Sequence, residues 1–161
     1  MSAAEPATPG GAALRAPLPA DYAAIAAWLP DATACQRWAG PHLAFPFAAE
    51  ELEGLLRVDG GSDHCLSDAG MAVLGFGQHW PTSGENTHLG RIIVSPTARA
   101  RGLGRLLCRQ LMASALLRPG SRTFTLRVYR DNARAMRLYA SLGFAPVEAE
   151  SGADILFMRT A

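Results

Sequence analysis

The segment from Val94 to Gly104 combines glycine and arginine in a way that is typical of an anion-binding turn. Gly102 and Gly104 carry no side chain, so the backbone there can approach a ligand closely. A helix that begins at this point leaves its first N–H groups unpaired and directs the positive end of its dipole at the ligand. Positive charge around the same turn comes from Arg99, Arg101 and Arg105. The segment therefore predicts binding of a pyrophosphate; the alternative is an ordinary helix start with incidental glycines.

Other ligand-binding patterns are missing from the sequence. Leu107 stands where a GxGxxG dinucleotide fingerprint has its third glycine, and a chain without lysine has no Walker lysine. The three cysteines, Cys35, Cys65 and Cys108, are widely spaced and form no CxxC pair, which argues against a zinc ribbon or a disulfide framework. We therefore expect no metal site, and a protein of the reducing cytoplasm.

A second patterned segment follows the first along the chain. It contains, in order, Leu126, Val128, Asn132, Ala135, Tyr139, Gly143 and Phe144. The motif residues of the first segment are Val94, Pro96, Arg99, Gly102 and Gly104. The order and spacing of the two sets resemble the signature motifs of the GNAT superfamily of N-acetyltransferases, and together they span about a third of the chain, from Leu89 to Phe144. The sequence departs from the family pattern at Ala100, where the family often has glycine, but an alanine methyl still allows a tight turn.

The resemblance implies a site for acetyl-coenzyme A as a co-substrate. Backbone amides from Arg101 to Leu106 would hold its pyrophosphate, and the main chain of Ile92–Val94 would pair with the pantetheine arm like an added strand. A bulge in that strand would splay it from the next strand and so form a slot for the thioester. The co-substrate-binding residues expected on this basis are Ile92, Ile93, Val94, Arg99, Arg101, Gly102, Leu103, Gly104, Arg105 and Asn132.

Two side chains of the second segment acquire roles from the same resemblance. Asn132 would hydrogen-bond the co-substrate, and Tyr139 would lie near its sulfur. Acetylation of an amine requires protonation of the thiolate leaving group, and a phenol with a pKa of about 10 can supply that proton. The alternatives are structural: Tyr139 as a half-buried helix residue beside Leu142, and Asn132 as the N-cap of the helix over 133–142.

A general base is harder to assign. His88 lies six residues before Val94, where histone-acetylating members of the superfamily have what looks like a matching glutamate. A histidine with an ordinary pKa of about 6.5 is mostly neutral at cytoplasmic pH and can accept a proton. His88 is therefore the catalytic candidate beside Tyr139. Other candidates to accept the proton are Glu85, His79 and Glu50, or water alone. The structural alternative for His88 is an exposed histidine at a strand edge.

Charge is distributed unevenly along the chain. Residues 1–90 hold three arginines against ten acids, net −7, and residues 91–161 hold twelve against four, net +8. The acidic first half leads us to expect a cationic acceptor, because opposite charge concentrates a ligand near the site. The arginine-rich second half admits a different class of function, nucleic-acid binding, but the stretch 91–137 offers only Phe124 and Tyr129 as stacking aromatics. We therefore expect no nucleic acid as a partner, and the lack of a run of about 18 apolar residues leads us to expect no membrane. The resemblance to the superfamily makes a homodimer a candidate assembly.

The elements that must position these residues follow from periodicity and turn signals. Helices are expected over Tyr22–Trp28, Ala48–Arg57, Leu103–Leu117 and 133–142. Strands are expected over His64–Ser67, Met71–His79, Leu89–Val94, Thr123–Tyr129, Phe144–Glu148 and Asp154–Arg159. Gly70 is expected to supply the positive φ of the turn between the first two strands.

These elements predict a mixed α/β fold in a single domain. The resemblance makes it GNAT-like: a central mixed, mostly antiparallel sheet, splayed between strands 89–94 and 123–129 and flanked by helices. We expect a flexible tail over 1–13 and a domain over 14–161, with the acceptor side in 14–88 and the acetyl-coenzyme A core in 89–144. The implied activity is acetyl transfer from acetyl-coenzyme A to a primary amine of a small molecule or peptide in a ternary complex. The alternative on the same fold is a catalytically inactive acyl-coenzyme A-binding domain that serves as a sensor or partner.

Overall fold

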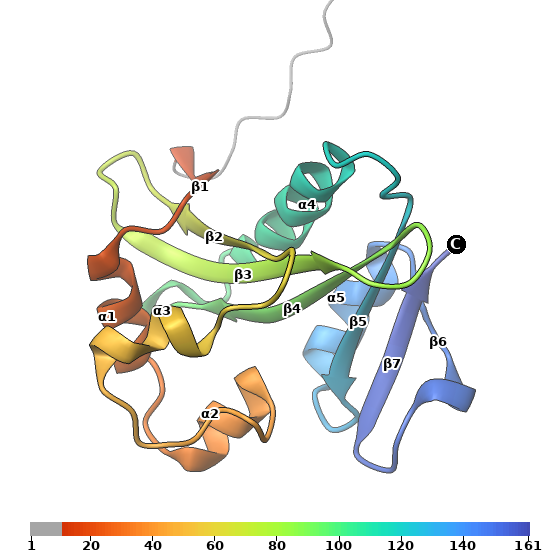
Figure 1. Ribbon diagram of the computed structural model, residues 1–161, viewed down its shortest axis with the longest axis horizontal. Helices are drawn as coiled ribbons and strands as arrows, with labels where there is room; N and C mark the ends of the chain where they lie inside the picture. The colour runs from red at the N-terminus through yellow and green to blue at the C-terminus, as the bar shows by residue number, and fades with distance from the viewer. Residues whose placement is uncertain (1–10) are drawn as a thin grey trace, which may run out of the picture.

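A single seven-stranded sheet organises the computed structural model, which describes residues 11–161 (Figure 1). The strand order is β1-β2-β3-β4-β5-β7-β6. The strands are β1 (Ala13–Arg15), β2 (Ser62–Ser67), β3 (Val73–Pro81), β4 (Asn86–Val94), β5 (Thr123–Tyr129), β6 (Phe144–Pro146) and β7 (Ile155–Thr160). Neighbouring strands are antiparallel except for β4 and β5, which are parallel. The mixed, mostly antiparallel sheet expected from the sequence is therefore confirmed.

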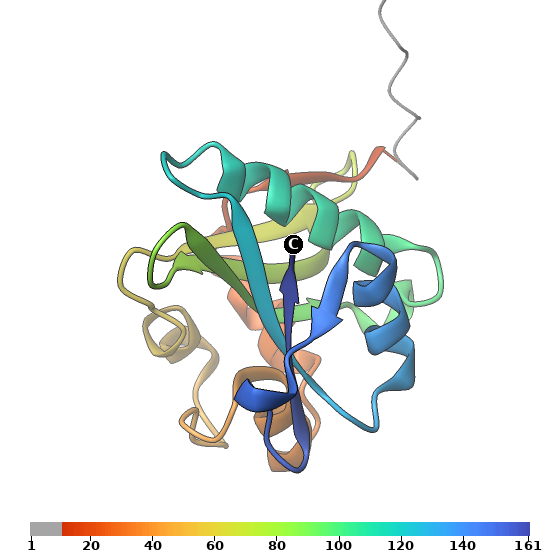
Figure 2. The ribbon, with the colours of Figure 1, turned by 90° about the vertical axis from the view of Figure 1, so that its right-hand side faces the viewer.

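Helices cover both faces of the sheet (Figures 1 and 2). On one face lie α1 (Pro19–Ala27), α2 (Ala32–Ala39) and α3 (Leu52–Leu55); on the other lie α4 (Leu103–Leu116) and α5 (Ala133–Ser141). The sheet thus separates two hydrophobic cores. Within residues 11–161 no helix is long and apolar enough to cross a membrane.

The parallel pair β4–β5 is short because the strands diverge. Backbone pairing runs from Asn86 and Thr123 only as far as His88 and Thr125. Beyond these residues β4 continues along the sheet while β5 turns away from it (Figure 1). The splay expected between these two strands is therefore present, and it opens the sheet at its centre.

A β-bulge lies in β4 at the place where β5 has left it. Two residues of β4, Arg91 and Ile92, stand opposite a single residue of β3, Gly77. Arg91 has a φ of 50°, in the left-handed region that a non-glycine residue adopts only at a cost. A Cβ on Gly77 would lie 2.5 Å from Leu111 of α4, so close packing of α4 on the sheet requires glycine there. The bulge bends β4 and changes the direction of its side chains at the opening of the sheet.

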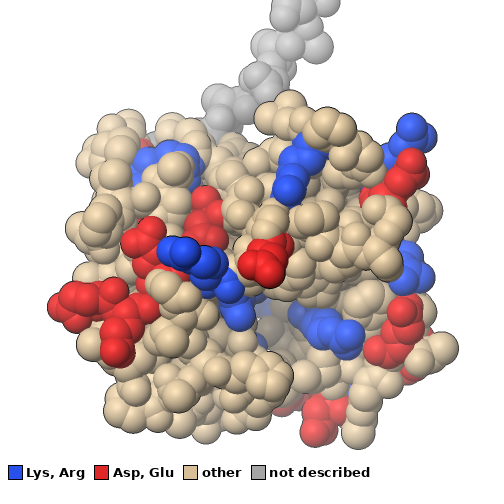
Figure 3. Space-filling view, viewed as in Figure 1, with Lys and Arg blue, Asp and Glu red and all other residues tan. Residues whose placement is uncertain are grey.

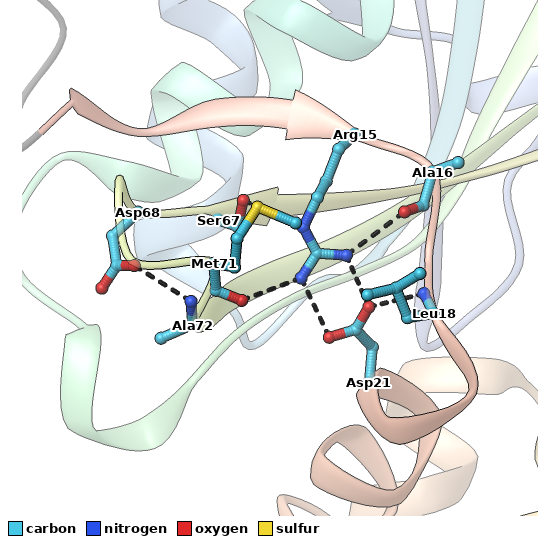
Figure 4. A network of polar contacts seen from close by, with 8 residues as sticks. All are labelled: Arg15, Ala16, Leu18, Asp21, Ser67, Asp68, Met71 and Ala72. Carbon is cyan, nitrogen blue, oxygen red and sulfur yellow. Dashed lines mark hydrogen bonds and ion pairs between the residues drawn. The ribbon is translucent and has the colours of Figure 1, made fainter.

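Arg15 holds β1 to the rest of the fold (Figure 4). Its guanidinium donates to the Asp21 carboxylate at 2.6 and 3.0 Å, to Ser67 Oγ at 3.1 Å and to the Met71 carbonyl at 3.0 Å. The same carboxylate accepts from the N–H of Leu18 at 2.6 Å, just before α1. One arginine therefore joins β1, α1 and the β2–β3 turn. β1 was not expected, because three residues are too few to show an alternating pattern.

Two helices differ from expectation. α2 was missed because it is only eight residues long, although Cys35, Trp38 and Ala39 are apolar at helical spacing and face the core. The Asp31 carboxylate nevertheless caps it by accepting from the N–H of Ala34 at 2.8 Å. The helix expected over Ala48–Arg57 is wrong in length: it is a 3-10 turn, Ala49–Glu51, followed by the four residues of α3. Leu52 and Leu56 of this segment are buried and pack into the core on the side of α1.

The structure also differs from expectation at the start of the chain and in the first hairpin. Of the tail expected over 1–13, residues 1–10 lie outside the described residues, whereas Ala12 is buried and β1 begins at Ala13, before the expected start of the domain. In the β2–β3 turn the residue with positive φ is Met71, at 67°, so its assignment to Gly70 was wrong. Asp68 explains the shift, because its carboxylate accepts from the N–H groups of both Gly70 and Ala72.

Candidate functional site

A cleft of about 460 Å³ lies where β4 and β5 diverge. Both faces of the sheet contribute to its walls. The lining comes from β4 (His88–Ile92), β5 (Leu126–Tyr129), α2 with the loop after it (Gln36–His42), the start and inner face of α5 (Asn132, Ala135 and Tyr139), Trp80 and Ile155. The cleft therefore reaches from the side of α5 through the opened sheet to the side of α2. Within residues 11–161 no three His, Cys, Asp or Glu side chains are grouped closely enough to hold a metal ion.

The anion-binding turn predicted from the sequence forms the beginning of α4. Gly102 is the N-cap residue with a φ of 75°, and no side chain caps the helix. The first helical bond joins the N–H of Leu106 to the carbonyl of Gly102 at 3.2 Å, so the N–H groups of the preceding turn have no intrahelical partner. A Cβ on Gly104 would lie 3.5 Å from Leu138, an ordinary contact, so packing within the protein does not require glycine there. These open amides suit an anionic ligand.

The three arginines predicted at this turn are all exposed and differ in their contacts. Arg101 donates to the carbonyl of Thr97 at 3.2 Å, within the turn itself. Arg105 donates to Ser141 Oγ at 2.7 Å and so links α4 to α5. Arg99, at the end of the 3-10 turn Pro96–Ala98, forms no side-chain hydrogen bond within residues 11–161. Positive charge therefore surrounds the uncapped start of α4.

Ala100 has a φ of 63°, which gives a physical reason for the glycine that the family often has at this position. The left-handed conformation costs an L-residue about 1–2 kcal/mol. The expectation that a small methyl is simply accommodated was incomplete, because the cost lies in the backbone conformation and not in space.

The edge of β4 that faces β5 has no strand partner beyond His88. On the opposite edge Ile93 and Val94 pair with β3, so that edge is occupied. Ile92 lines the cleft and packs with Val94 toward the core of α4, whereas Ile93 packs into the core on the side of α1. An extended ligand could therefore pair with the open backbone edge of Ile92–Val94.

Tyr139 and Asn132 lie together on the α5 side of the cleft. Tyr139 is 9% exposed, packs edge-on against Phe144, and its hydroxyl forms no hydrogen bond within residues 11–161. Burial raises the pKa of this phenol above its ordinary value. Asn132 caps α5, its Oδ1 accepting from the N–H of Ala135 at 3.2 Å, and Gly143 follows the helix with a φ of 98°. Both residues fill the structural roles considered above and also line the cleft.

His88 lies at the last β4–β5 pair and is half-buried, so it is not the exposed strand-edge histidine of the structural alternative. Its Nδ1 is 2.9 Å from Thr125 Oγ1. Its ring lies between those of Trp80 and Phe157, with centroids 5.0 and 6.4 Å away. Burial, and then the positive charge of Arg127, lower the pKa of His88 to about 4. The imidazole is therefore neutral at pH 7.

None of the other candidate bases lines the cleft. Glu85 is exposed next to β4 and pairs with Arg122, and Glu50 belongs to the 3-10 turn before α3. His79 is buried on the side of α4, where its Nε2 lies 3.1 Å from His64 Nε2 and 3.2 Å from Ser114 Oγ. Of the four candidates, His88 alone shares the cleft with Tyr139.

Sequence reasoning missed Arg127, Trp80 and Phe157. Arg127 lies between Leu126 and Val128, which were recognised as buried strand residues, so strand alternation could have placed it on the opposite face. Trp80 belongs to a group of aromatics in the first half, with Trp28, Trp38, Phe45 and Phe47, and the sequence does not show which of them line an acceptor pocket. Nothing in the sequence pairs Phe157 with Arg127, because that register is set by the antiparallel pairing of β5 and β7.

The cleft is lined by basic residues and, within residues 11–161, by no carboxylate. Arg37, Arg91 and Arg127 belong to its walls. Figure 3 shows basic side chains at the rim of the hollow near the centre of this face. Acidic residues of the first half make contacts outside the cleft: Asp21 pairs with Arg15, and Asp63 accepts hydrogen bonds from Tyr22 and Gln78. The acidic residues from which a cationic acceptor was expected therefore do not line this cleft.

Comparison with protein families identifies one matching description, the acetyltransferase (GNAT) family, over residues 25–144. A curated relative from Mycobacterium leprae, named as an uncharacterized protein, is 36% identical over 104 residues. The match covers 61% of this chain and 26% of that protein, so the chain spans about a quarter of the relative's length.

Solved structures resemble the chain over almost its whole length. Spermidine N-acetyltransferase from Vibrio cholerae, in complex with CoA and spermine, has a TM-score of 0.75 and 18% identity over 92% of this chain and 94% of that one. AAC(6′)-Ib in complex with ribostamycin and coenzyme A has a TM-score of 0.73 and 18% identity, covering 94% and 93%. The ribosomal-protein-S18-alanine N-acetyltransferase from Escherichia coli has a TM-score of 0.66 and 23% identity, covering 92% of each chain. At these identities the likeness establishes a shared fold.

Proposed function

This chain belongs to the GNAT family of acetyltransferases, and we propose that it transfers the acetyl group of acetyl-coenzyme A to a primary amine of a small molecule or peptide in a ternary complex. The observation that carries the proposal is the cleft between β4 and β5, which brings an open strand edge, Tyr139 and His88 together. The uncapped start of α4 follows β4 along the chain. Two structurally similar proteins are N-acetyltransferases, and two of the similar structures are complexes with CoA.

The residues present fit acetyl-coenzyme A as the co-substrate. The first-turn amides of α4, with Arg99 and Arg101 beside them, offer hydrogen bonds and positive charge to a pyrophosphate. The open backbone edge of Ile92–Val94 suits the amide-bearing pantetheine arm. Asn132 uses its Oδ1 to cap α5, which leaves its amide N–H groups for the co-substrate.

In the proposed reaction the lone pair of the neutral amine attacks the thioester carbonyl carbon. The C–N bond forms, the C–S bond breaks, and its electron pair leaves with sulfur. Tyr139 donates its proton to that sulfur and is reprotonated from solvent; its raised pKa keeps it protonated at neutral pH. The proton lost from nitrogen passes to water, because His88, neutral at pH 7 with a pKa of about 4, is too weak a base to keep it.

The alternatives considered from the sequence lead to different expectations. An inactive acyl-coenzyme A-binding domain would bind the same co-substrate without releasing thiol. A nucleic-acid-binding module would need a free arginine surface, yet several arginines of the second half are engaged: Arg122 with Glu85, Arg130 with Glu148 and Arg159 with Glu150. Acetyl transfer is the function that uses the whole cleft.

The experiment that tests the proposal is release of free coenzyme A thiol from acetyl-coenzyme A across a panel of primary amines. We expect amine-dependent release by the wild-type protein. Binding of acetyl-coenzyme A without release on any amine would support the inactive domain instead. Salt-sensitive retention on nucleic acid, unaffected by acetyl-coenzyme A, would support the nucleic-acid module.

A further inference from the structure

We propose that the acceptor is an amino acid or a similar small amine that carries a carboxylate, and that Arg127 binds this carboxylate on the α2 side of the cleft. The proposal rests on the acetyltransferase function proposed above and adds the class of acceptor. It replaces the cationic acceptor expected from the charge of residues 1–90.

Arg127 lies on the face of β5 that is turned away from α4 and α5. Leu126 and Val128, its neighbours in the strand, are 1% and 6% exposed in the core packed against those helices. Strand alternation therefore directs the side chain of Arg127 to the opposite face. It comes two residues after Thr125, the last residue of β5 that pairs with β4, so Arg127 stands where the sheet opens. It lines both the cleft and an adjoining hollow of about 380 Å³.

The charge of Arg127 has no partner in the described part of the chain. No carboxylate of residues 11–161 lies within 4.0 Å of its guanidinium, which stacks over the ring of Phe157 at 4.8 Å. The other cleft arginines are engaged. Arg37 forms two bonds to Asp131, at 2.6 and 3.2 Å, and Arg91 donates to the carbonyl of Leu56 and to Gln78. Arg127 is thus the cleft arginine available to a ligand carboxylate, which the guanidinium fork suits geometrically.

His88 adds a second polar group to the same wall. Asn86 Nδ2 donates to Thr125 Oγ1 at 2.8 Å, and the Thr125 hydroxyl in turn can give its proton to His88 Nδ1, 2.9 Å away. With this pairing the Asn86 amide, the Thr125 hydroxyl and His88 Nδ1 each have a partner, and the proton of the imidazole is on Nε2. His88 then offers the ligand a donor, as Arg127 does. The rings of Trp80 and Phe157 on either side of His88 give the wall flat apolar surfaces.

An acceptor with several positive charges does not fit this wall. Its charges would have to lose water beside Arg127 without a carboxylate of the cleft lining to replace it. Glu150 lines the adjoining hollow but is already paired with Arg159 at 3.0 Å. Electrostatic complementarity therefore favours an anionic group on the acceptor.

The test compares amines that differ only in the carboxylate. The panel consists of the protein amino acids, their amides and the corresponding decarboxylated amines, with spermine and ribostamycin as cationic comparators. Acetyl-coenzyme A is saturating, and kcat/KM is measured by thiol release. We expect the carboxylated member of the preferred set to exceed its amide and its decarboxylated amine about tenfold to hundredfold, as for loss of a charge-assisted hydrogen bond.

Variants of Arg127 assign the effect to its side chain. Arg127→Gln should remove the difference between carboxylate and amide, and Arg127→Glu should reverse it in favour of amines without a carboxylate. Arg127 is exposed, so both variants are expected to fold. Arg57→Gln is the matched control: Arg57 is exposed after α3, lines none of the cavities described and should leave the preference unchanged.

Three results would overturn the proposal while leaving the acetyltransferase function intact: equal or better use of the amides, better use of spermine or ribostamycin than of any carboxylated amine, or a carboxylate preference that survives Arg127→Gln. Absence of thiol release with every amine would overturn both proposals. The two failures are therefore distinguishable in one set of assays.

Discussion

Tyr139 lies almost fully buried in the wall of the cleft, yet its hydroxyl forms no hydrogen bond within residues 11–161. The hydroxyl oxygen itself is not one of the buried, unpaired polar atoms of these residues, which are Trp38 Nε1 and His79 Nδ1, so it is open to the cleft and can take a partner there. A ligand atom in the cleft would supply that partner. Burial also favours the neutral phenol over the phenolate, so Tyr139 carries its proton at neutral pH and has it available for the departing sulfur.

Tyr139→Phe should therefore lower kcat about a hundredfold and leave acetyl-coenzyme A affinity nearly unchanged, because it removes one proton donor and almost no packing. The measurement is steady-state thiol release together with titration of the co-substrate. Tyr22→Phe is the matched control: the Tyr22 hydroxyl donates to Asp63 at 2.7 Å in the other core. That control should lose roughly 1 kcal/mol of stability and keep its turnover. Wild-type kcat in Tyr139→Phe would assign the tyrosine to packing alone.

Three histidines, His64, His79 and His88, have lowered pKa values in the folded chain and make stability depend on pH. Burial, followed by the charges of His64 and Arg118, lowers the pKa of His79 to about 4, and the pKa of His88 is also about 4. Both groups have an ordinary pKa of about 6.5 in the unfolded chain. Between these values the unfolded chain binds protons that the folded chain does not, so the stability present above pH 6.5 is lost as the pH falls toward 4.

We expect the free energy of unfolding, measured with urea, to fall by roughly 2 kcal/mol for each of His79 and His88 between about pH 7 and pH 5. His79→Leu removes one of these titrating groups from a buried site and should reduce the loss by roughly 2 kcal/mol. An equal loss in wild type and variant would show that other groups carry the acid sensitivity.

At the scale of the elements, sequence reasoning placed the second half more accurately than the first. β5 was predicted residue for residue, and α4 and α5 to within one residue, because heptad-like leucines, strand alternation and Gly143 all indicate the same boundaries. α2 and β1 were missed because they are short and stabilised by distant contacts, such as the bonds of Arg15 to Asp21 and Met71. The family motif predicts that the sheet opens between β4 and β5. The positions of Trp80 and Arg127 in the wall of the cleft depend on the register between strands.

The turn before α4 carries a backbone strain that glycine would relieve. Ala100→Gly should stabilise the protein by up to about 1 kcal/mol. The strain energy that alanine has in the left-handed conformation is larger than the free-energy cost of the extra entropy that glycine gives the unfolded chain. Urea denaturation measures this change. Ala98→Gly, at a buried position of the preceding 3-10 turn, should instead destabilise. A loss of stability in Ala100→Gly would contradict the strain assigned to this turn.

At the scale of the whole molecule, the sheet separates two cores and the cleft connects their two sides. The side of α4 and α5 presents open amides, arginines and Tyr139, whereas the side of α1 to α3 presents Arg37, His42 and the aromatic wall. Arg37 and Asp131 join the sides across the mouth of the cleft, but both are exposed, so this pair contributes little stability. The net charge of a chain segment was a poor guide to the charge of the cleft, because the acids of that segment stabilise turns and helix ends.

Acetyl-coenzyme A binding at the start of α4 is the premise of the proposed function, and the thermal shift that this binding produces tests it most directly. At a concentration about a hundredfold above Kd the co-substrate should raise the Tm of the wild-type protein by roughly 5–10 °C. Gly104→Val should abolish the shift, because its side chain obstructs the approach to the first-turn amides. Gly54→Val, on α3 where a Cβ meets nothing within 4 Å, should keep it. An equal shift in both variants, or no shift in the wild-type protein, would contradict the site described here.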